Sequence, residues 1–411
     1  MSEKDEIFNR MFHDENQVPQ YTLPPVLSEA GETAYHWVNH RRRQLLDLFK
    51  EMYGPIPGRP DQIRFEQLSY CSHALNNTAI RKEIRIHCTM SNGASIYFDL
   101  LLYLPKSSVP APVCLGLNFK GNHACTIEPD VMLSRAVTPE PALTHNPAML
   151  PPDENSRGEQ TGRWCFEDVI RRGYASATIH YQQIFPDYPD GFPDSIYKLF
   201  YTREQMTAPD RKFGAISAWA WGLMRAMDYL ETESGVDPNR TLLHGHSRLG
   251  KTALWAGAND PRFRLVYSNN SGCCGAALTR RNFGETLEWL LYWRKYWFNM
   301  ALNKHIGHEN EMSFDQHMLI ALIAPRPAYV ASATEDTYAD PRGEFLSARY
   351  AAPAYELFGS PGLGTDEWPP PDTPVGCDIG YHLRTGGHDI TAYDWNCVLD
   401  FADRHFTRSH S

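Results

Sequence analysis

The chain has 411 residues, of which 42% are apolar and 12% aromatic, and its formal net charge is -10. This length and composition predict a globular protein with one large domain or two smaller ones, and they argue against extended disorder. The acidic balance and the lack of a long Lys/Arg run argue against nucleic acid as a partner. The longest apolar stretches are too short to span a bilayer, so we expect no membrane partner.

The N-terminal segment 1–16 is charged and lacks the apolar core of a signal peptide. If Met1 is the natural start, we expect a cytoplasmic protein. If a signal peptide was removed, we expect a secreted or periplasmic one. Nine scattered cysteines predict mostly buried thiols and leave one or two disulfides open.

The first quarter of the chain reads as an irregular arm over 17–30 and a helix over 33–53 that ends at Gly54-Pro55. We expect segment 1–60 to pack as an arm and helix on a single domain that covers 1–411. Alternating apolar and polar residues then predict antiparallel strands, at 61–68, 79–88 and 95–104.

From about residue 112 onward, short apolar runs alternate with helical segments. The expected strands are 113–117, 175–180, 241–244, 266–269, 328–333 and 379–383, and the expected helices are 165–172, 213–231 and 394–406. Strands that alternate with helices predict a mostly parallel sheet covered on both faces. The predicted fold is therefore an α/β-hydrolase fold, a three-layer sandwich with long loops over the C-terminal strand ends.

Four long segments between these elements are rich in Pro, Gly, Asp or aromatic residues: 124–164, 184–212, 272–316 and 359–377. Loops of this length in a compact domain are usually lids or binding loops. The alternative is that they only cover the core.

The sharpest local signal is the run from Leu242 to Lys251, in which an apolar strand leads into Gly245-His-Ser247 and a helix follows. This is the context of a nucleophile elbow, where a serine in a strained turn needs small neighbours. The run departs from the usual G-x-S-x-G pattern, because Leu249 stands where the second glycine is expected and Gly250 follows it. The alternative is a serine that only caps the helix.

A nucleophilic serine needs a base and an acid, which this fold supplies in the order Ser, acid, His. His388 follows two glycines after the last strand, and Asp336 follows the penultimate strand. Glu335 or Asp340 could replace Asp336, and His388 could be an ordinary loop histidine. We therefore predict a triad of Ser247, His388 and Asp336, with Glu335 as the main alternative acid.

The oxyanion of an acyl-transfer reaction needs two donors. We expect the backbone N–H of Arg248 to supply one and the loop near Phe119 the other, with the Arg248 guanidinium as a further charged donor. This chemistry needs no metal and no organic cofactor, so we expect none. The pair His305 and His308 could suggest a metal, but it lacks a third ligand.

The motif Gly245–Lys251, Gly-His-Ser-Arg-Leu-Gly-Lys, resembles the signature of the glucuronoyl esterases, especially their bacterial branch. The resemblance covers roughly 15–408. It extends to segments 219–230, 270–277, 283–286, 315–317, 324–327, 339–345 and 386–389.

This resemblance implies cleavage of an ester at C6 of glucuronic or 4-O-methylglucuronic acid on xylan, with a lignin-like or methyl alcohol side. By position, Ser247 is the nucleophile, His388 the base and Arg248 the oxyanion support. The expected sugar contacts are Lys251, Glu285 and Trp297. Their alternatives are a surface lysine, an ion pair with Arg280 or Arg281, and core packing, respectively.

Three departures from the family pattern bear on the site. Asn270 stands where fungal members carry their acid, which favours Asp336 as the acid here. His246 stands where fungal members have a bridged cysteine. The run from Trp289 to Phe298 also differs from the usual sequence.

We therefore expect a monomeric serine esterase that acts by two-step acyl transfer on a uronic acid ester or oligosaccharide. One alternative is another carbohydrate esterase, such as an acetylxylan esterase. A second, of a different class, is a catalytically silent sugar-binding protein.

Overall fold

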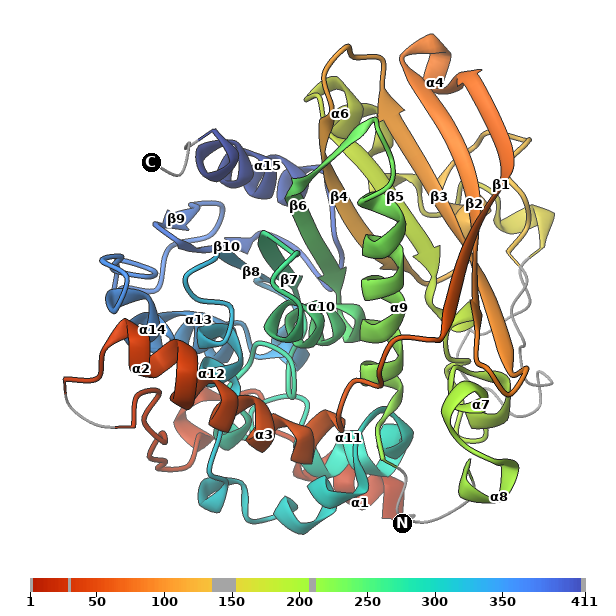
Figure 1. Ribbon diagram of the computed structural model, residues 1–411. Helices are drawn as coiled ribbons and strands as arrows, with labels where there is room; N and C mark the ends of the chain where they lie inside the picture. Colours follow the sequence, from red (N-terminus) through yellow and green to blue (C-terminus); the bar gives the residue numbers. More distant parts are fainter. Residues whose placement is uncertain (1–2, 29–30, 135–152, 207–211, 408–411) are drawn as a thin grey trace. The chain divides into compact units, whose positions relative to one another are not determined.

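The computed structural model describes residues 3–28, 31–134, 153–206 and 212–407 (Figure 1). They form two compact units. The first unit comprises Met1–Pro55, Lys212–Ile216 and His244–Ser411, and the second comprises Ile56–Arg211 and Ser217–Leu243. Parts of the predicted arm and of two predicted long loops, at 29–30, 135–152 and 207–211, lie outside the described residues.

The second unit is built on a mixed sheet with strand order β1-β2-β3-β5-β4-β6. Strands β1 (Gln62–His73), β2 (Ala79–Thr89), β3 (Ser95–Pro105) and β5 (Ala175–His180) pair antiparallel in that order. Strand β4 (Ala111–Asn118) pairs parallel with β5. Both β4 and β5 are buried along their whole length, as expected for central strands covered on two faces.

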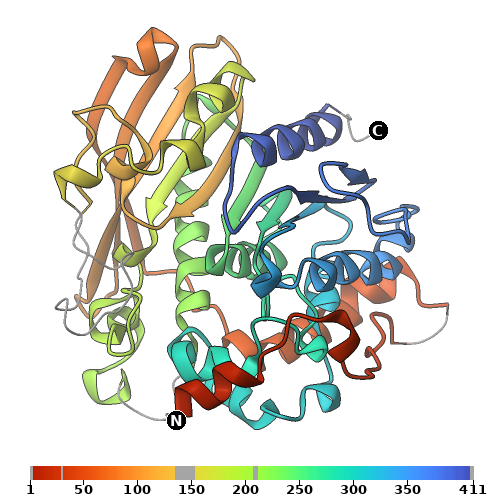
Figure 2. The ribbon, with the colours of Figure 1, turned by 180° about the vertical axis from the view of Figure 1, so that it is seen from behind.

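Helices cover both faces of this sheet. Ring contacts from Tyr229 to Phe65 and from Trp221 to Phe98 pack α9 (Ala215–Leu230) on one face. On the other face, α6 (Phe166–Arg171) contacts β3 and β5 (Figure 2). The shorter helices are α4 (Ala74–Asn77), α5 (Thr161–Trp164), α7 (Tyr197–Phe200) and α8 (Arg203–Met206).

In the first unit the strand order is β7-β8-β10-β9. Strands β7 (Leu265–Asn269), β8 (Ala328–Ala333) and β10 (Ile379–Arg384) are parallel, and β9 (Val375–Gly376) is antiparallel to β10. Strand β6 (Val236–His246) begins in the second unit and contributes its last three residues to the first. The C-terminal ends of parallel strands meet at one edge of a sheet, which places their loops together.

Figures 1 and 2 show α15 (Ala392–Phe406) on one side of these strands and α10 (Arg248–Asn259) and α13 (Pro341–Tyr350) on the other. Helix α10 contacts β7, and α13 contacts β8 and β10. The remaining helices of this unit are α1 (Glu3–Arg10), α2 (Ala34–His36), α3 (Arg42–Tyr53), α11 (Leu287–Arg294), α12 (Gln316–Ala321) and α14 (Ala352–Glu356).

The expected fold class is confirmed, because a mostly parallel mixed sheet with flanking helices is the α/β-hydrolase arrangement. The predicted helix over 33–53 is interrupted by a π-helical turn, Trp37–Arg41. Helices also interrupt predicted loops: α5 lies in 124–164, α7 and α8 lie in 184–212, and α11 lies in 272–316. All nine cysteines are free thiols. In the part of the chain that the structure describes, no helix is long and apolar enough to cross a membrane. A single domain over 1–411 stays a prediction.

Candidate active site

Ser247 occupies a sharp turn between β6 and α10. Its backbone has φ 58° and ψ -131°, a sparsely populated conformation for a residue with a side chain. The Ser247 N–H donates to the carbonyl oxygen of Asn269 at 2.9 Å, which ties the turn to the end of β7. The strand, the strained serine and the helix match the nucleophile elbow that the sequence predicts.

The glycines beside Ser247 explain the departure from G-x-S-x-G. A Cβ atom on Gly245 would lie 1.9 Å from the backbone oxygen of Leu249, so this position admits only glycine. A Cβ atom on Gly250 would lie 2.9 Å from Cβ of Ser271. Leu249 is 1% exposed and packs in the core. The second small residue of the elbow is therefore Gly250, one position later than usual.

His388 lies in the loop after β10, and Asp336 lies just after β8. The Nδ1 atom of His388 is 2.6 Å from Oδ2 of Asp336, and Asp336 is buried whereas His388 is partly exposed. Of the alternative acids, Glu335 is exposed, and Asp340 pairs with Nε of Arg281 at 2.8 Å. The structure thus brings Asp336 to His388.

Asn270 also contacts the carboxylate of Asp336. Its Nδ2 donates to Oδ2 of Asp336 at 2.6 Å, and its own backbone N–H donates to the carbonyl oxygen of Ala331 at 2.7 Å. Asn270 has φ 46°, in the left-handed region that asparagine tolerates better than most residues. The sequence marked Asn270 only as a missing acid, whereas the structure shows it as a hydrogen-bond donor to Asp336.

Glu344, on α13, joins the loops that carry Asn270 and Asp336. Its Oε1 accepts the backbone N–H groups of Ser271 at 2.7 Å and Gly272 at 3.0 Å, and its Oε2 accepts the Ser332 hydroxyl at 2.7 Å. Burial raises the pKa of Glu344 to about 8 against the effect of these hydrogen bonds. Sequence reasoning gave Glu344 no role, because its partners are mostly backbone groups.

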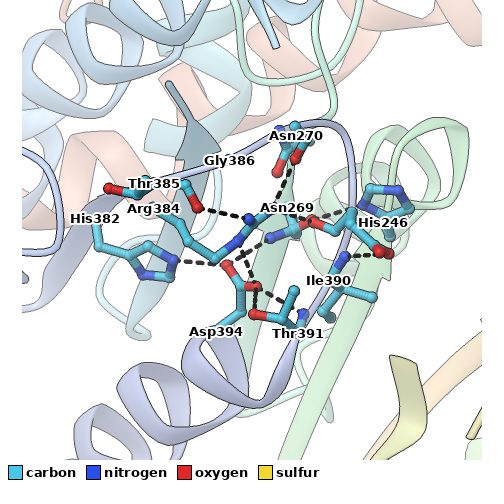
Figure 3. A network of polar contacts seen from close by, with 12 residues as sticks. His246, Asn269, Asn270, His382, Arg384, Thr385, Gly386, Ile390, Thr391 and Asp394 are labelled. Atoms are coloured by element: carbon cyan, nitrogen blue, oxygen red, sulfur yellow. Dashed lines mark hydrogen bonds and ion pairs between the residues drawn. The ribbon is translucent and has the colours of Figure 1, made fainter. Parts of the chain in front are cut away.

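Arg384, at the end of β10, braces the His388 loop (Figure 3). Its Nη1 donates to the carbonyl oxygen of Thr385 at 3.0 Å. Its Nη2 donates to the carbonyl oxygens of Gly387 at 2.8 Å and Asp389 at 3.0 Å. The backbone on both sides of His388 is therefore fixed by one guanidinium group.

Lys251, on α10, is buried and not a surface lysine. Its Nζ donates to the carbonyl oxygens of Ser271 at 2.6 Å and Cys273 at 2.5 Å, and to Oε2 of Glu285 at 3.0 Å. These three bonds use all three N–H groups of the ammonium. In this structure Lys251 therefore anchors Glu285 and the loop after β7.

The alternative partners of Glu285 are engaged elsewhere. Arg280 pairs with Asp315 at 3.0 Å, and Arg281 pairs with Asp340. The sequence leaves a structural ion pair as the alternative role of Glu285. Glu285 does form an ion pair, but with Lys251 instead of Arg280 or Arg281.

Trp297 is 5% exposed. Cζ of Arg248 lies 5.0 Å from the centroid of its ring, and Cζ of Arg294 lies 5.6 Å from it. Such cation–π contacts fix the direction of the Arg248 side chain.

Phe119 belongs to the second unit, so its part in an oxyanion hole stays a prediction. Among the described residues, no group of three or more His, Cys, Asp or Glu side chains could hold a metal ion.

Comparison with known proteins places this site in context. The sequence model of fungal glucuronyl esterases matches residues 173–359. The chain is 43% identical over 405 residues to a carbohydrate esterase from an unknown prokaryotic organism, covering 96% of this chain and 92% of that relative. It is 38% identical over 127 residues to a 4-O-methyl-glucuronoyl methylesterase of Podospora anserina, covering 28% of this chain and 26% of the relative.

Among solved structures, a glucuronoyl esterase from Solibacter usitatus superposes with a TM-score of 0.87 at 43% identity. The match covers 95% of this chain and 99% of that chain. The similarity therefore extends through the fold as a whole and is not confined to the motif around Ser247.

Proposed function

Because the chain belongs to the glucuronoyl esterase family, we propose that it hydrolyses esters of glucuronic or 4-O-methylglucuronic acid, as in lignin–carbohydrate linkages on glucuronoxylan. The observation that carries the proposal is the pairing of His388 with buried Asp336 in the same unit as the strained Ser247. These are the groups that a serine esterase needs.

In the proposed mechanism, Nε2 of His388 takes the proton of the Ser247 hydroxyl as its oxygen attacks the ester carbonyl. Asp336 accepts from Nδ1–H of His388, which orients the imidazole and stabilises its cationic form. The tetrahedral oxyanion is held by the backbone N–H of Arg248 and by the loop near Phe119.

The imidazolium of His388 then gives its proton to the leaving alcohol, and an acyl-enzyme remains on Ser247. Water attacks this ester with His388 again as base. The bond between the acyl carbon and the Ser247 oxygen then breaks, the imidazolium of His388 returns its proton to that oxygen, and the uronic acid leaves. Each step moves only protons and acyl groups.

For the sugar we propose contacts with Glu285 and Trp297, and with Lys251 where a sugar hydroxyl replaces one of its present acceptors. The Podospora anserina relative is named for methyl esters of 4-O-methylglucuronate, which supports the uronic acid as the acyl group. We further propose that the enzyme acts as a monomer.

The substrate class is tested by comparing kcat/KM for benzyl glucuronate with kcat/KM for para-nitrophenyl acetate. We expect a clear preference for the glucuronate ester. A preference for acetate would favour the acetylxylan esterase alternative. Tight binding of glucuronate esters with no turnover of either substrate would favour the silent sugar-binding protein.

A further inference from the structure

A buried carboxylate, Asp394, is the centre of the polar network behind the His388 loop (Figure 3). Its side chain is 0% exposed. It hydrogen-bonds Nε2 of His382 at 2.8 Å and forms an ion pair with Nε of Arg384 at 2.9 Å. The N–H and hydroxyl of Thr391 donate to its Oδ2 at 2.7 and 2.8 Å. Burial raises the pKa of Asp394, but the hydrogen bond to His382 and the positive charge of Arg384 outweigh this effect and keep the pKa below its ordinary value. Asp394 is therefore ionised and can only accept hydrogen bonds.

Because Asp394 only accepts hydrogen bonds, it fixes the orientation of the Asn269 amide at the end of β7. Nδ2 of Asn269 donates to Oδ1 of Asp394 at 3.3 Å and to the hydroxyl of Tyr267 at 3.0 Å. Oδ1 of Asn269 consequently faces Nδ1 of His246, 2.6 Å away. Since a carbonyl oxygen only accepts, the network assigns the hydrogen of this bond to Nδ1 of His246.

His246, the residue before Ser247, lies against the ring of His388. The two ring centroids are 4.5 Å apart, and the ring planes are inclined by 44°. His246 is 5% exposed, whereas the side chain of His388 is 42% exposed. The buried ring of His246 is thus held in place, and the solvent-exposed ring of His388 packs against it.

The hydrogen bond from His388 to Asp336 holds the imidazole at one atom. This bond and the covalent link at Cγ fix one edge of the ring, but small side-chain rotations still tilt the ring and move Nε2. A second ring packed against the imidazole limits that rotation. Because proton transfer requires Nε2 within hydrogen-bond reach of the Ser247 hydroxyl, ring orientation bears directly on the rate.

We propose that His246 is a positioning residue for His388, and that Asp394 fixes it in place through Asn269. The inference rests on the proposed function, since it requires His388 to be the general base. It predicts an effect on kcat and not on KM, because His246 acts on the proton transfer and not on sugar binding.

The test compares two substitutions that remove different parts of the contact. His246→Asn keeps a donor near the position of Nδ1 but removes the ring, and we expect kcat to fall about tenfold to a hundredfold with KM almost unchanged, as expected for a displaced catalytic group. His246→Phe keeps a ring but loses the bond to Asn269, and we expect a smaller loss of kcat. A purely structural role would instead make kcat follow the melting temperature of the variants.

The matched control is His244→Asn, two residues earlier on β6. His244 is buried and packs edge-on against Trp395, with centroids 4.8 Å apart. We expect this variant to lose stability while keeping kcat within about twofold, since the site geometry is unchanged. A kcat for His246→Asn equal to that of His244→Asn would overturn the proposal.

A double-mutant cycle on an activated aryl ester separates this inference from the proposed function. In a His388→Ala background, His246→Asn should cause no further loss, because its effect passes through His388. A full loss in that background would overturn the positioning role. Wild-type activity in His388→Ala alone would instead overturn the proposed triad.

Discussion

Asn270 donates from Nδ2 to Oδ2 of Asp336 at 2.6 Å, and Nδ1 of His388 lies 2.6 Å from that same oxygen. One carboxylate oxygen thus faces two side chains, one neutral and one that becomes cationic in the proposed reaction. A carboxylate in place of Asn270 would repel Asp336, whereas the amide supports its ionised form. Asn270 and Asp336 therefore act together on His388.

Replacing the acid should remove most of the activity. We expect Asp336→Asn to lower kcat by about 10³- to 10⁴-fold, because an amide no longer stabilises the imidazolium or its tautomer. Glu335→Gln, one residue earlier and exposed, is the matched control and should keep kcat. Steady-state hydrolysis of benzyl glucuronate measures both, and the opposite ranking would assign the acid to Glu335.

Removing the amide of Asn270 should weaken catalysis less than removing Asp336. We expect Asn270→Ala to lower kcat by about 10- to 100-fold, because a hydrogen bond to a charged group contributes about 1.5–3 kcal/mol. Asn303→Ala, at an exposed position of the same unit, serves as the control. Unchanged kinetics in Asn270→Ala would show that Asp336 does not need this donor.

Glu344 should make stability depend on pH. Its folded-state pKa is raised to about 8 by burial, above the ordinary value of 4.5. Between these values the folded state binds the proton and the unfolded state does not, so the contribution of Glu344 is fully present below the unfolded pKa and is lost as pH rises toward 8.

We therefore expect the free energy of unfolding of the wild type, relative to Glu344→Gln, to decrease from pH 5 to about pH 8. Urea titrations across this range give the difference between the two proteins directly. A difference that stays constant or increases with pH would mean that Glu344 is ionised in the folded protein.

The elbow should not tolerate a methyl group at position 245. A Cβ atom there would meet a backbone oxygen at 1.9 Å, so we expect Gly245→Ala to lower the free energy of unfolding by at least about 1–3 kcal/mol and to reduce activity. Gly162→Ala, where a Cβ atom meets nothing within 4 Å, is the control. Equal stability of the two variants in thermal unfolding would contradict the inference that position 245 admits only glycine.

The strands that the sequence located best are continuous apolar runs. Strands β5 and β8 begin and end where predicted, because strands buried on both faces have no polar alternation to confuse their bounds. Strand β6 starts five residues before its predicted start, at Val236, since its first half contains Asp237, Pro238 and Arg240, which are unusual in strands.

For the site, the sequence could order the serine, acid and histidine but could not choose among three neighbouring carboxylates. That choice depends on which side chain reaches His388. Asp336 does, whereas Glu335 is exposed and Asp340 pairs with Arg281. The contact of His246 with His388 and the hydrogen bond of Asn270 join residues far apart in the chain. Their positions depend on the packing of β6, β7 and β10, which local patterns do not record.

The most direct test of the proposed function is hydrolysis of benzyl glucuronate by the wild type and by Ser247→Ala, with mass spectrometry of the intact protein to detect an acyl-enzyme. We predict turnover by the wild type, loss of at least about 10³-fold in the variant, and an adduct only when Ser247 is present. Turnover that survives in Ser247→Ala would contradict the assignment of the nucleophile and, with it, the mechanism proposed for this esterase.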